Sequence, residues 1–96
     1  MKLLHLTFRH EFSGAVEQIL DRHEICDFVW HPMAQGRDRD GKHYGSKVYP
    51  GSTAVVQALV EDDRLEKLLK DLKAYREEKT SHAHLCAAVI SVEKLL

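Results

Sequence analysis

The chain has 96 residues, of which 44% are hydrophobic and 30% are charged, and its formal net charge is −1. This composition is that of an ordinary globular protein, which excludes global disorder, and the near-zero charge gives no reason to expect a nucleic-acid partner. No stretch approaches the roughly 20 apolar residues of a membrane-spanning helix, so we expect one domain over residues 1–96 without membrane insertion.

The first half of the chain contains a predicted strand, a helix and a second strand. Residues 2–9 alternate between two faces, as a strand requires. A helix is expected from Ser13, its N-cap, to about residue 23. Residues 25–31 are β-branched and aromatic, which predicts the second strand. The apolar faces of the first strand and the helix comprise Leu4, Leu6, Phe8, Val16, Ile19 and Leu20.

The second half repeats the pattern after a long loop. Residues 53–61 predict a third strand, and Asp62 and Asp63 then open a second helix at the end of the macrodipole that favours acidic side chains. Residues 85–93 predict a fourth strand. The apolar stripe of the second helix comprises Leu65, Leu68, Leu69, Leu72 and Tyr75. The element order is therefore βαββαβ.

With right-handed crossovers, this order predicts a ferredoxin-like α+β sandwich, in which a four-stranded antiparallel sheet carries two helices on one face. The other face is then uncovered. The third and fourth strands are nevertheless apolar on both sides, for example at Val55 and Leu59, and such strands need cover on both faces. We expect the open face to pack against other copies of the chain; a monomer with an apolar sheet face is the alternative.

The two cysteines, Cys26 and Cys86, lie in apolar runs and lack a C-x-x-C spacing. This pattern favours buried free thiols over a disulfide framework or a zinc ribbon. The amino-terminal residues show no cleavage-site pattern of a signal peptide. A cytoplasmic location is therefore expected.

Residues 32–51 form a loop much longer than the usual connection, and loops of this length commonly carry function. Pro50 and Gly51 predict a turn that leads into the third strand. Basic side chains separated by glycines could order around a nucleotide, another phosphorylated metabolite or an acidic partner. The alternative is a solvated tip, because Asp38 and Asp40 nearly balance the charge. The candidate ligand-binding residues are Arg37, Arg39, Lys42, Gly45 and Lys47.

Seven histidines suggest a second kind of site. His82 and His84 are two residues apart, which on an extended segment places both rings on one side. They could share zinc, copper or nickel if His31 or His43, at the two ends of the loop, arrived as a third ligand across a subunit cleft. The alternative is that these are ordinary loop and packing histidines.

An enzyme is not expected. The sequence has no nucleophile motif, no glycine-rich nucleotide fingerprint of the Walker or Rossmann type and no H-E-x-x-H. The carboxylates of the second helix alternate with lysine and arginine, which is typical of a solvated helix face.

The chain resembles the PII nitrogen-regulatory superfamily and its shorter PII-like relatives. The resemblance rests on the element order, the start "MKLL", and a long loop that ends in "HYGSKVYPGSTAVV" before the third strand. It implies a homotrimer whose sheets face inward, clefts between subunits that hold adenine nucleotides in PII proteins, and a mobile loop that contacts a partner protein.

One segment departs from the PII pattern. PII proteins carry a glycine-rich, phosphate-binding connection before the last strand, whereas here it is "REEKTSHAHL", which has no glycine.

The copper-tolerance CutA proteins share the expected fold and trimer, but of their motifs only Trp30 has a counterpart. The resemblance thus implies a regulatory protein that binds a small anionic metabolite. A metal sensor or metal-buffering module of the same fold is the alternative.

Overall fold

The computed structural model describes residues 1–38, 41–43 and 53–96. Its main sheet has four antiparallel strands in the order β2-β5-β1-β6, where the central pair is β1 (Lys2–Arg9) and β5 (Thr53–Val60). The edge strands are β2 (Phe28–Ala34) and β6 (Cys86–Ser91). This order confirms the ferredoxin-like α+β prediction.

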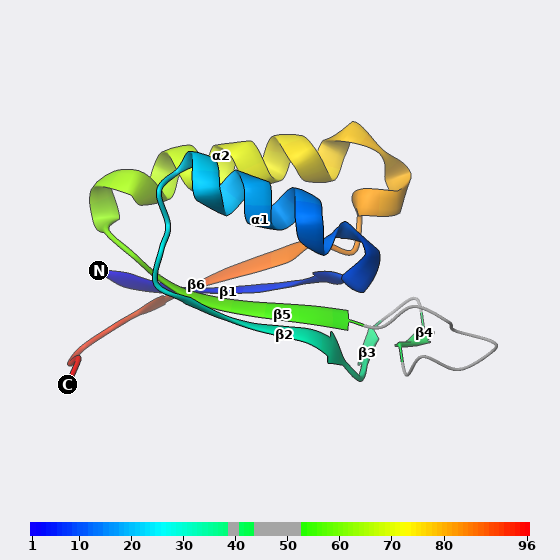
Figure 1. Ribbon diagram of the computed structural model, residues 1–96, viewed down its shortest axis with the longest axis horizontal. Helices are drawn as coiled ribbons and strands as arrows, with labels where there is room; N and C mark the ends of the chain where they lie inside the picture. Colours follow the sequence, from blue (N-terminus) through cyan, green and yellow to red (C-terminus); the bar gives the residue numbers. More distant parts are fainter. Residues whose placement is uncertain (39–40, 44–52) are drawn as a thin grey trace.

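Both helices lie on the same face of this sheet (Figure 1). They are α1 (Ser13–Arg22) and α2 (Asp62–Glu78). Two short 3-10 turns join the layers, η1 (His10–Phe12) before α1 and η2 (Thr80–His82) after α2. Among the described helices, none is long and apolar enough to cross a membrane.

One hydrophobic core fills the space between the sheet and the helices. Alternate residues of β1 and β5 point into it, because the period of a strand is two and only one face meets the helices. The helices contribute the apolar stripes that the sequence predicts. Among the described residues, the buried core comprises Leu4, Leu6, Phe8, Val16, Ile19, Leu20, Ile25, Ala54, Val56, Ala58, Val60, Leu65, Leu68, Leu72 and Leu85.

The start of α1 differs from the sequence prediction. Ser13 is the first helical residue rather than the N-cap, with φ −56° and ψ −43°, and Phe12 occupies the cap position. The reason is the η1 turn, which continues directly into the helix. The Ser13 hydroxyl donates a hydrogen bond of 2.7 Å back to the carbonyl oxygen of His10 in that turn.

The second strand begins at Phe28, three residues later than expected. Ile25 belongs instead to the helix layer: its backbone N–H donates to the carbonyl of Leu20 at 3.0 Å and its side chain is buried in the core. The backbone reverses just before it at Glu24, whose φ is +57°. Ile25, which its β-branched side chain assigned to the second strand, therefore packs against the end of α1 instead.

The cysteine prediction is correct for the thiols and wrong for their burial. Both Cys26 and Cys86 are free, and both are exposed. Cys26 follows Ile25 in the connection to β2, and Cys86 stands opposite Thr7 of β1 on the sheet face that no helix covers. Apolar neighbours in sequence did not bury them, because one precedes its strand and the other faces outward from the edge strand.

The segment 32–51 contains more regular structure than expected. Strand β2 continues to Ala34, and the described part beyond it holds a small ladder of β3 (Gly36–Asp38) and β4 (Gly41–His43). Figure 1 shows this ladder beyond the end of the main sheet. The predicted turn at Pro50 and Gly51 lies outside the described residues.

Candidate functional site

The base of the long loop is shaped by an irregularity in the β2 and β5 ladder. His31 pairs with Val55 and Ala34 pairs with Thr53, so two residues of β2 oppose the single residue Ala54 of β5 between these pairs. Such a bulge twists a strand and redirects its side chains, and the first extra residue is Pro32, which has no N–H for a ladder hydrogen bond. The bulge therefore bends the strand where it enters the loop.

A hollow of about 460 Å³ lies against this bulge. Its walls are mixed, because the apolar bulge residues lie beside polar groups of both strands, and Met33 projects outward with a relative exposure of 67%. The hollow lies on the sheet face opposite the helices, because His31 and Val55 pair out of phase with the buried residues Val56 and Ala58. Its lining comprises His31, Pro32, Met33, Ala34, Val55 and Gln57.

The rest of this open sheet face is apolar with a polar centre. Leu3 stands between Leu59 and Ile90 in the sheet register, and these side chains form its apolar part. One step further along β1, however, His5 stands opposite Gln57. The face is thus less uniformly apolar than the third and fourth strands suggested, and it carries hydrogen-bonding groups at its middle.

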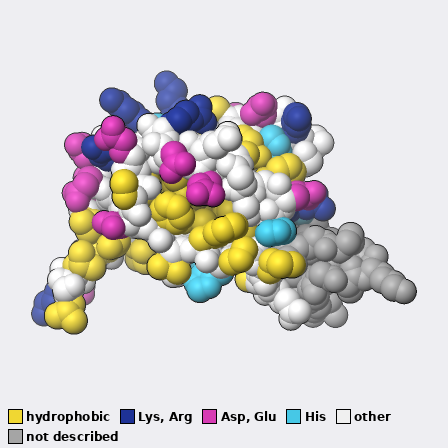
Figure 2. Space-filling view, in the orientation of Figure 1, with side chains coloured by type: hydrophobic (Ala, Val, Ile, Leu, Met, Phe, Trp, Pro, Cys, Tyr) yellow, Lys and Arg dark blue, Asp and Glu magenta, His cyan; other side chains and the backbone are white. Residues whose placement is uncertain are grey.

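Figure 2 shows how side-chain types are distributed in the view of Figure 1. Most lysine and arginine side chains lie over the helices in the upper part, hydrophobic side chains gather in the middle and lower part, toward the sheet, and histidines appear at several heights. The charged helix surface agrees with the interpretation of the α2 charges as a solvated face.

The predicted loop cations fall partly within the described residues. Arg37 of β3 stands opposite Lys42 of β4 in the small ladder, so the fold brings these two candidates into register. His43 stands opposite Gly36 in the same ladder. Arg39, Gly45 and Lys47 lie outside the described residues, and their ligand-binding role stays a prediction.

His82 occupies a packed position rather than an open one. Its ring is 6% exposed, stacks on Tyr75 at a centroid distance of 4.0 Å and meets the edge of Phe12 at 4.8 Å. Its Nδ1 donates a 2.7 Å hydrogen bond to the carbonyl of Tyr75, which assigns that proton to Nδ1. In the same cluster, burial raises the pKa of Tyr75, and the charge of Glu78 adds to this.

Among the described side chains, no other metal candidate forms a ligand group with His82. His31 lies on the edge strand β2, and the 80–85 connection leads into β6 at the opposite edge of the sheet. No group of three potential ligands occurs among the described side chains. His84, which is half-buried, has an interaction of its own. The metal hypothesis, which calls for His31 or His43 to arrive as a third ligand across a subunit cleft, stays a prediction.

Sequence reasoning missed the bulge and its hollow. It placed Pro32 and Met33 in the loop, because proline in a sequence usually ends a strand. The apolar character of Met33 after the apolar run of β2 was the available signal. Gln57 was also overlooked, although it is the one polar side chain among the eight residues of β5 other than the threonine at its start.

Comparison with known proteins supports the fold. No family model matches this sequence, and no curated protein matches it. Among solved structures, CPII from Thiomonas intermedia K12, a nitrogen regulatory PII-like protein bound to ADP, AMP and bicarbonate, is similar with a TM-score of 0.76 at 14% identity, over 95% of this chain and 90% of that one. The apo form of CPII gives a TM-score of 0.69 at 14% identity, over 92% and 84% of the two chains.

A PII-like signalling protein from Thermus thermophilus, described as putative, is similar with a TM-score of 0.68 at 15% identity, over 95% of this chain and 85% of that one. These structures cover nearly the whole chain at low identity. They show that this protein has the fold of PII-like proteins, and the resemblance found in the sequence is confirmed at that level.

Proposed function

We propose that this protein is a cytoplasmic, non-enzymatic PII-like regulatory protein. In this proposal it forms a homotrimer, binds a small anionic metabolite in the clefts between subunits, with an adenine nucleotide as the first candidate, and contacts a partner protein through the loop 32–51. The observation that carries the proposal is the likeness of the whole chain to CPII, whose structures contain ADP, AMP and bicarbonate.

The open sheet face supports the assembly. Leu3, Leu59 and Ile90 lie together on a face that no helix covers, and contact with another copy would remove this apolar surface from water. His5 and Gln57 at the centre of that face could hydrogen-bond across such a contact. A trimer is chosen over a dimer because of the resemblance to PII-like proteins.

The loop base supports the location of the ligand. The hollow at the bulge opens beside the start of β3, which carries Arg37, while Lys42 stands opposite it in the ladder. Arginine binds phosphate oxygens through two parallel N–H groups, so a phosphate held near these residues would also bias the conformation of the loop. Population shift requires this kind of differential contact between ligand-free and ligand-bound states.

The missing glycines before β6 shape the proposal. The connection after α2 is the η2 turn, and His82 from it fills the space beside Tyr75 with a ring. The phosphate contacts in this protein must therefore come mainly from cationic side chains of the loop rather than from a glycine-rich backbone cradle.

Native mass spectrometry of the purified protein, alone and with ADP, AMP, ATP or cyclic nucleotides, tests the proposal. We expect a trimer that takes up about three nucleotides, as the symmetry of a closed ring requires. The variant Arg37→Glu/Arg39→Glu should bind at least about tenfold more weakly and stay trimeric, because it reverses charge at the ligand and not at the sheet face. Lys67→Glu/Lys70→Glu, on α2, is the matched control.

A monomer under all conditions would contradict the assembly and with it the cleft. A trimer that ignores every nucleotide, or that loses binding equally in the control variant, would contradict the ligand site. The metal alternative is tested in the same instrument with zinc, copper and nickel. Stoichiometric metal uptake that His84→Ala abolishes would favour the metal module over the nucleotide-binding regulator.

A further inference from the structure

A second hollow lies between α2 and β6, on the helix side of the sheet and at the edge opposite the loop base. It is a groove of about 170 Å³, lined by Leu69, Leu72, Lys73, Arg76, Leu85 and Ala87. Leu72 and Leu85 belong to the buried core, so the groove has a fixed apolar wall. Ala87, at the start of β6, leaves the space open because its side chain is a single methyl group.

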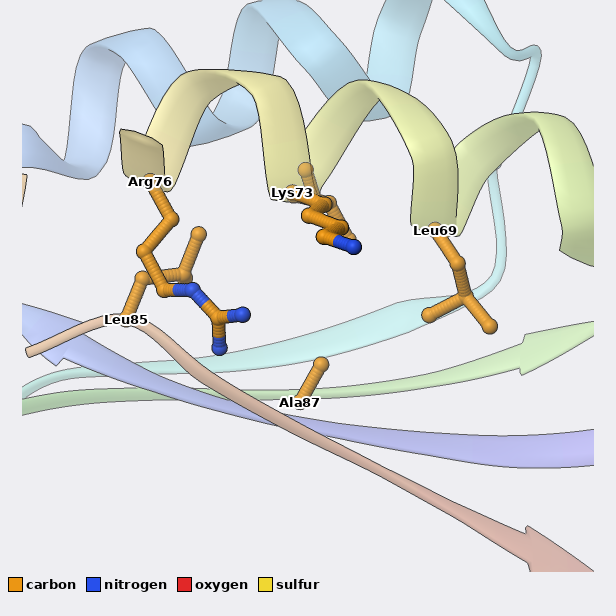
Figure 3. Close-up of a pocket in the computed structure, with 6 residues that line it drawn as sticks. Leu69, Lys73, Arg76, Leu85 and Ala87 are labelled. Carbon is orange, nitrogen blue, oxygen red and sulfur yellow. The ribbon is translucent and has the colours of Figure 1, made fainter. Parts of the chain in front are cut away.

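Two cationic side chains, Lys73 and Arg76, line this groove. Figure 3 shows Arg76 extending from α2 toward β6, with its guanidinium between Leu85 and Ala87 in this view, whereas the Lys73 side chain stays closer to the helix. The residues are three apart, which places them on one face of the helix. Both side chains therefore line the groove, Arg76 at its centre and Lys73 at its rim, where Lys73 also borders a second hollow.

Neither cation has an acidic partner within the described part of the chain. The ion pairs found there join other groups, and Asp71, the nearest preceding carboxylate in sequence, is occupied by His23 and Arg22. Lys67 and Lys70 do not line the groove; they lie with Glu66 around a neighbouring hollow that Leu69 and Lys73 also border. An anion that entered the groove would meet two cations that form no ion pair among the described residues, above an apolar floor.

We propose that this groove binds a small amphiphilic carboxylate. The carboxylate would accept hydrogen bonds from the Arg76 guanidinium and the Lys73 ammonium group, and a short hydrocarbon body would cover Leu69, Leu85 and Ala87. A volume equal to about six water molecules limits the ligand to roughly six to ten heavy atoms. Within one chain the groove is separate from the hollow at the loop base, since it lies on the other face and the other edge of the sheet.

The probe for this proposal is hexanoate, with hexanamide as its uncharged match. In a titration of the isotope-labelled full chain followed by amide NMR shifts, we expect saturable changes centred on Leu69, Leu85 and Ala87 with hexanoate. Hexanamide should bind at least about tenfold more weakly, because it cannot form charge-assisted hydrogen bonds with the two cations.

Variants separate this groove from general surface charge. Lys73→Gln/Arg76→Gln should weaken hexanoate binding by about tenfold or more, whereas Lys67→Gln/Lys70→Gln removes the same charge from the same helix and should leave binding unchanged. Ala87→Leu keeps both cations but fills the floor, and it should weaken binding at least about fivefold.

The proposal would be overturned if Lys73→Gln/Arg76→Gln and Lys67→Gln/Lys70→Gln lost the same amount of hexanoate affinity. It would also be overturned if the amide shifts were spread over the whole surface of α2, because both results indicate nonspecific charge attraction. Unchanged hexanoate affinity in Ala87→Leu would show that the ligand does not bind in the groove beside Ala87. These outcomes do not depend on whether the protein binds nucleotides, because no residue varied here lies at the loop base.

Discussion

The side chain of His82 joins three parts of the fold. It hydrogen-bonds to the backbone of Tyr75 at the end of α2, stacks on the ring of that residue and contacts Phe12 at the start of α1. Such a ring is held both by burial and by a polar contact that water would otherwise satisfy. The function of His82 within one subunit is therefore to fix the η2 turn against both helices.

We predict that His82→Ala lowers the free energy of unfolding by about 2–4 kcal/mol, because it creates a cavity and removes a buried hydrogen bond. His82→Phe keeps the stacked ring and should lose only about 1 kcal/mol, the value of the hydrogen bond. Urea unfolding measures both, with the exposed Ser81→Ala as control. Equal stability of His82→Ala and the parent protein would show that the packed ring contributes nothing.

Glu24 carries a local strain. Its φ of +57° lies in the left-handed region, which is energetically unfavourable for residues other than glycine and asparagine. Its carboxylate pairs with Arg64 at 2.9 Å, and the Arg64 guanidinium also donates to the carbonyl of His23 at 3.0 Å. This pair raises the pKa of Arg64, first through the hydrogen bond with Glu24. The pair is exposed, so it offsets little of the backbone cost.

Two substitutions of Glu24 separate the cost of its positive φ from the contribution of its ion pair. Glu24→Gly and Glu24→Ala both remove the ion pair, but only glycine relieves the positive φ. We expect the glycine variant to be about 1 kcal/mol more stable than the alanine variant in thermal or urea unfolding. If alanine proved the more stable of the two, the turn would not hold a positive φ in solution.

At the scale of elements, the long loop joins two strands of the main sheet. Ala34, near its start, stands directly opposite Thr53, just after its end. The strands on either side of the loop are therefore already neighbours, as in a hairpin. A connection this long, which the pairing of its flanking strands does not need, is the expected place for binding.

Replacing residues 36–51 with a short Asn-Gly turn should keep the fold. The shorter closure lowers the entropic cost by about 2 kcal/mol, so the thermal midpoint should stay or rise. The same variant should lose the nucleotide-dependent rise in thermal midpoint that the proposed function requires, because the loop cations are gone. An unfolded product would show that folding requires the loop and would contradict the prediction.

At the scale of the whole molecule, the two faces of the sheet differ in what covers them. The helix side is complete within one chain, whereas the other side exposes the row of Leu3, Leu59 and Ile90. Val29 and Met33, on β2, are more than half exposed. Burial of this surface in an assembly is the condition on which the proposed cleft depends.

Val55→Asp places a charge on this face, and we predict that it converts the assembly to monomers with unchanged circular dichroism. An unpaired carboxylate buried in an interface costs several kcal/mol, whereas on a free surface it costs little. Light scattering after size-exclusion chromatography measures the mass. Lys67→Asp, on the outer side of α2, is the control; dissociation in both variants would point to general charge effects rather than to the sheet face.

The fold was predictable because each element has its own period in the sequence. The alternation of residues 2–9 and the leucine spacing of α2 each specify one buried face, and two such faces pack in few ways. The errors fell at element ends. Ile25 and Ser13 were misplaced because the η1 turn and the reversal at Glu24 depend on contacts with the helix end rather than on neighbouring residue types.

The candidate sites were less predictable, because a site joins residues from separate elements. The sequence by itself determined the βαββαβ order, the identity of the core and the presence of a long basic loop, since these follow from local periodicity and composition. Only the tertiary structure decided that His82 is packed on Tyr75, that the β2 bulge opens a hollow at the loop base, and that Lys73 and Arg76 line the groove beside Ala87. The physical reason is that these features depend on side chains brought together across the sheet and helix layers, which no spacing along the chain records.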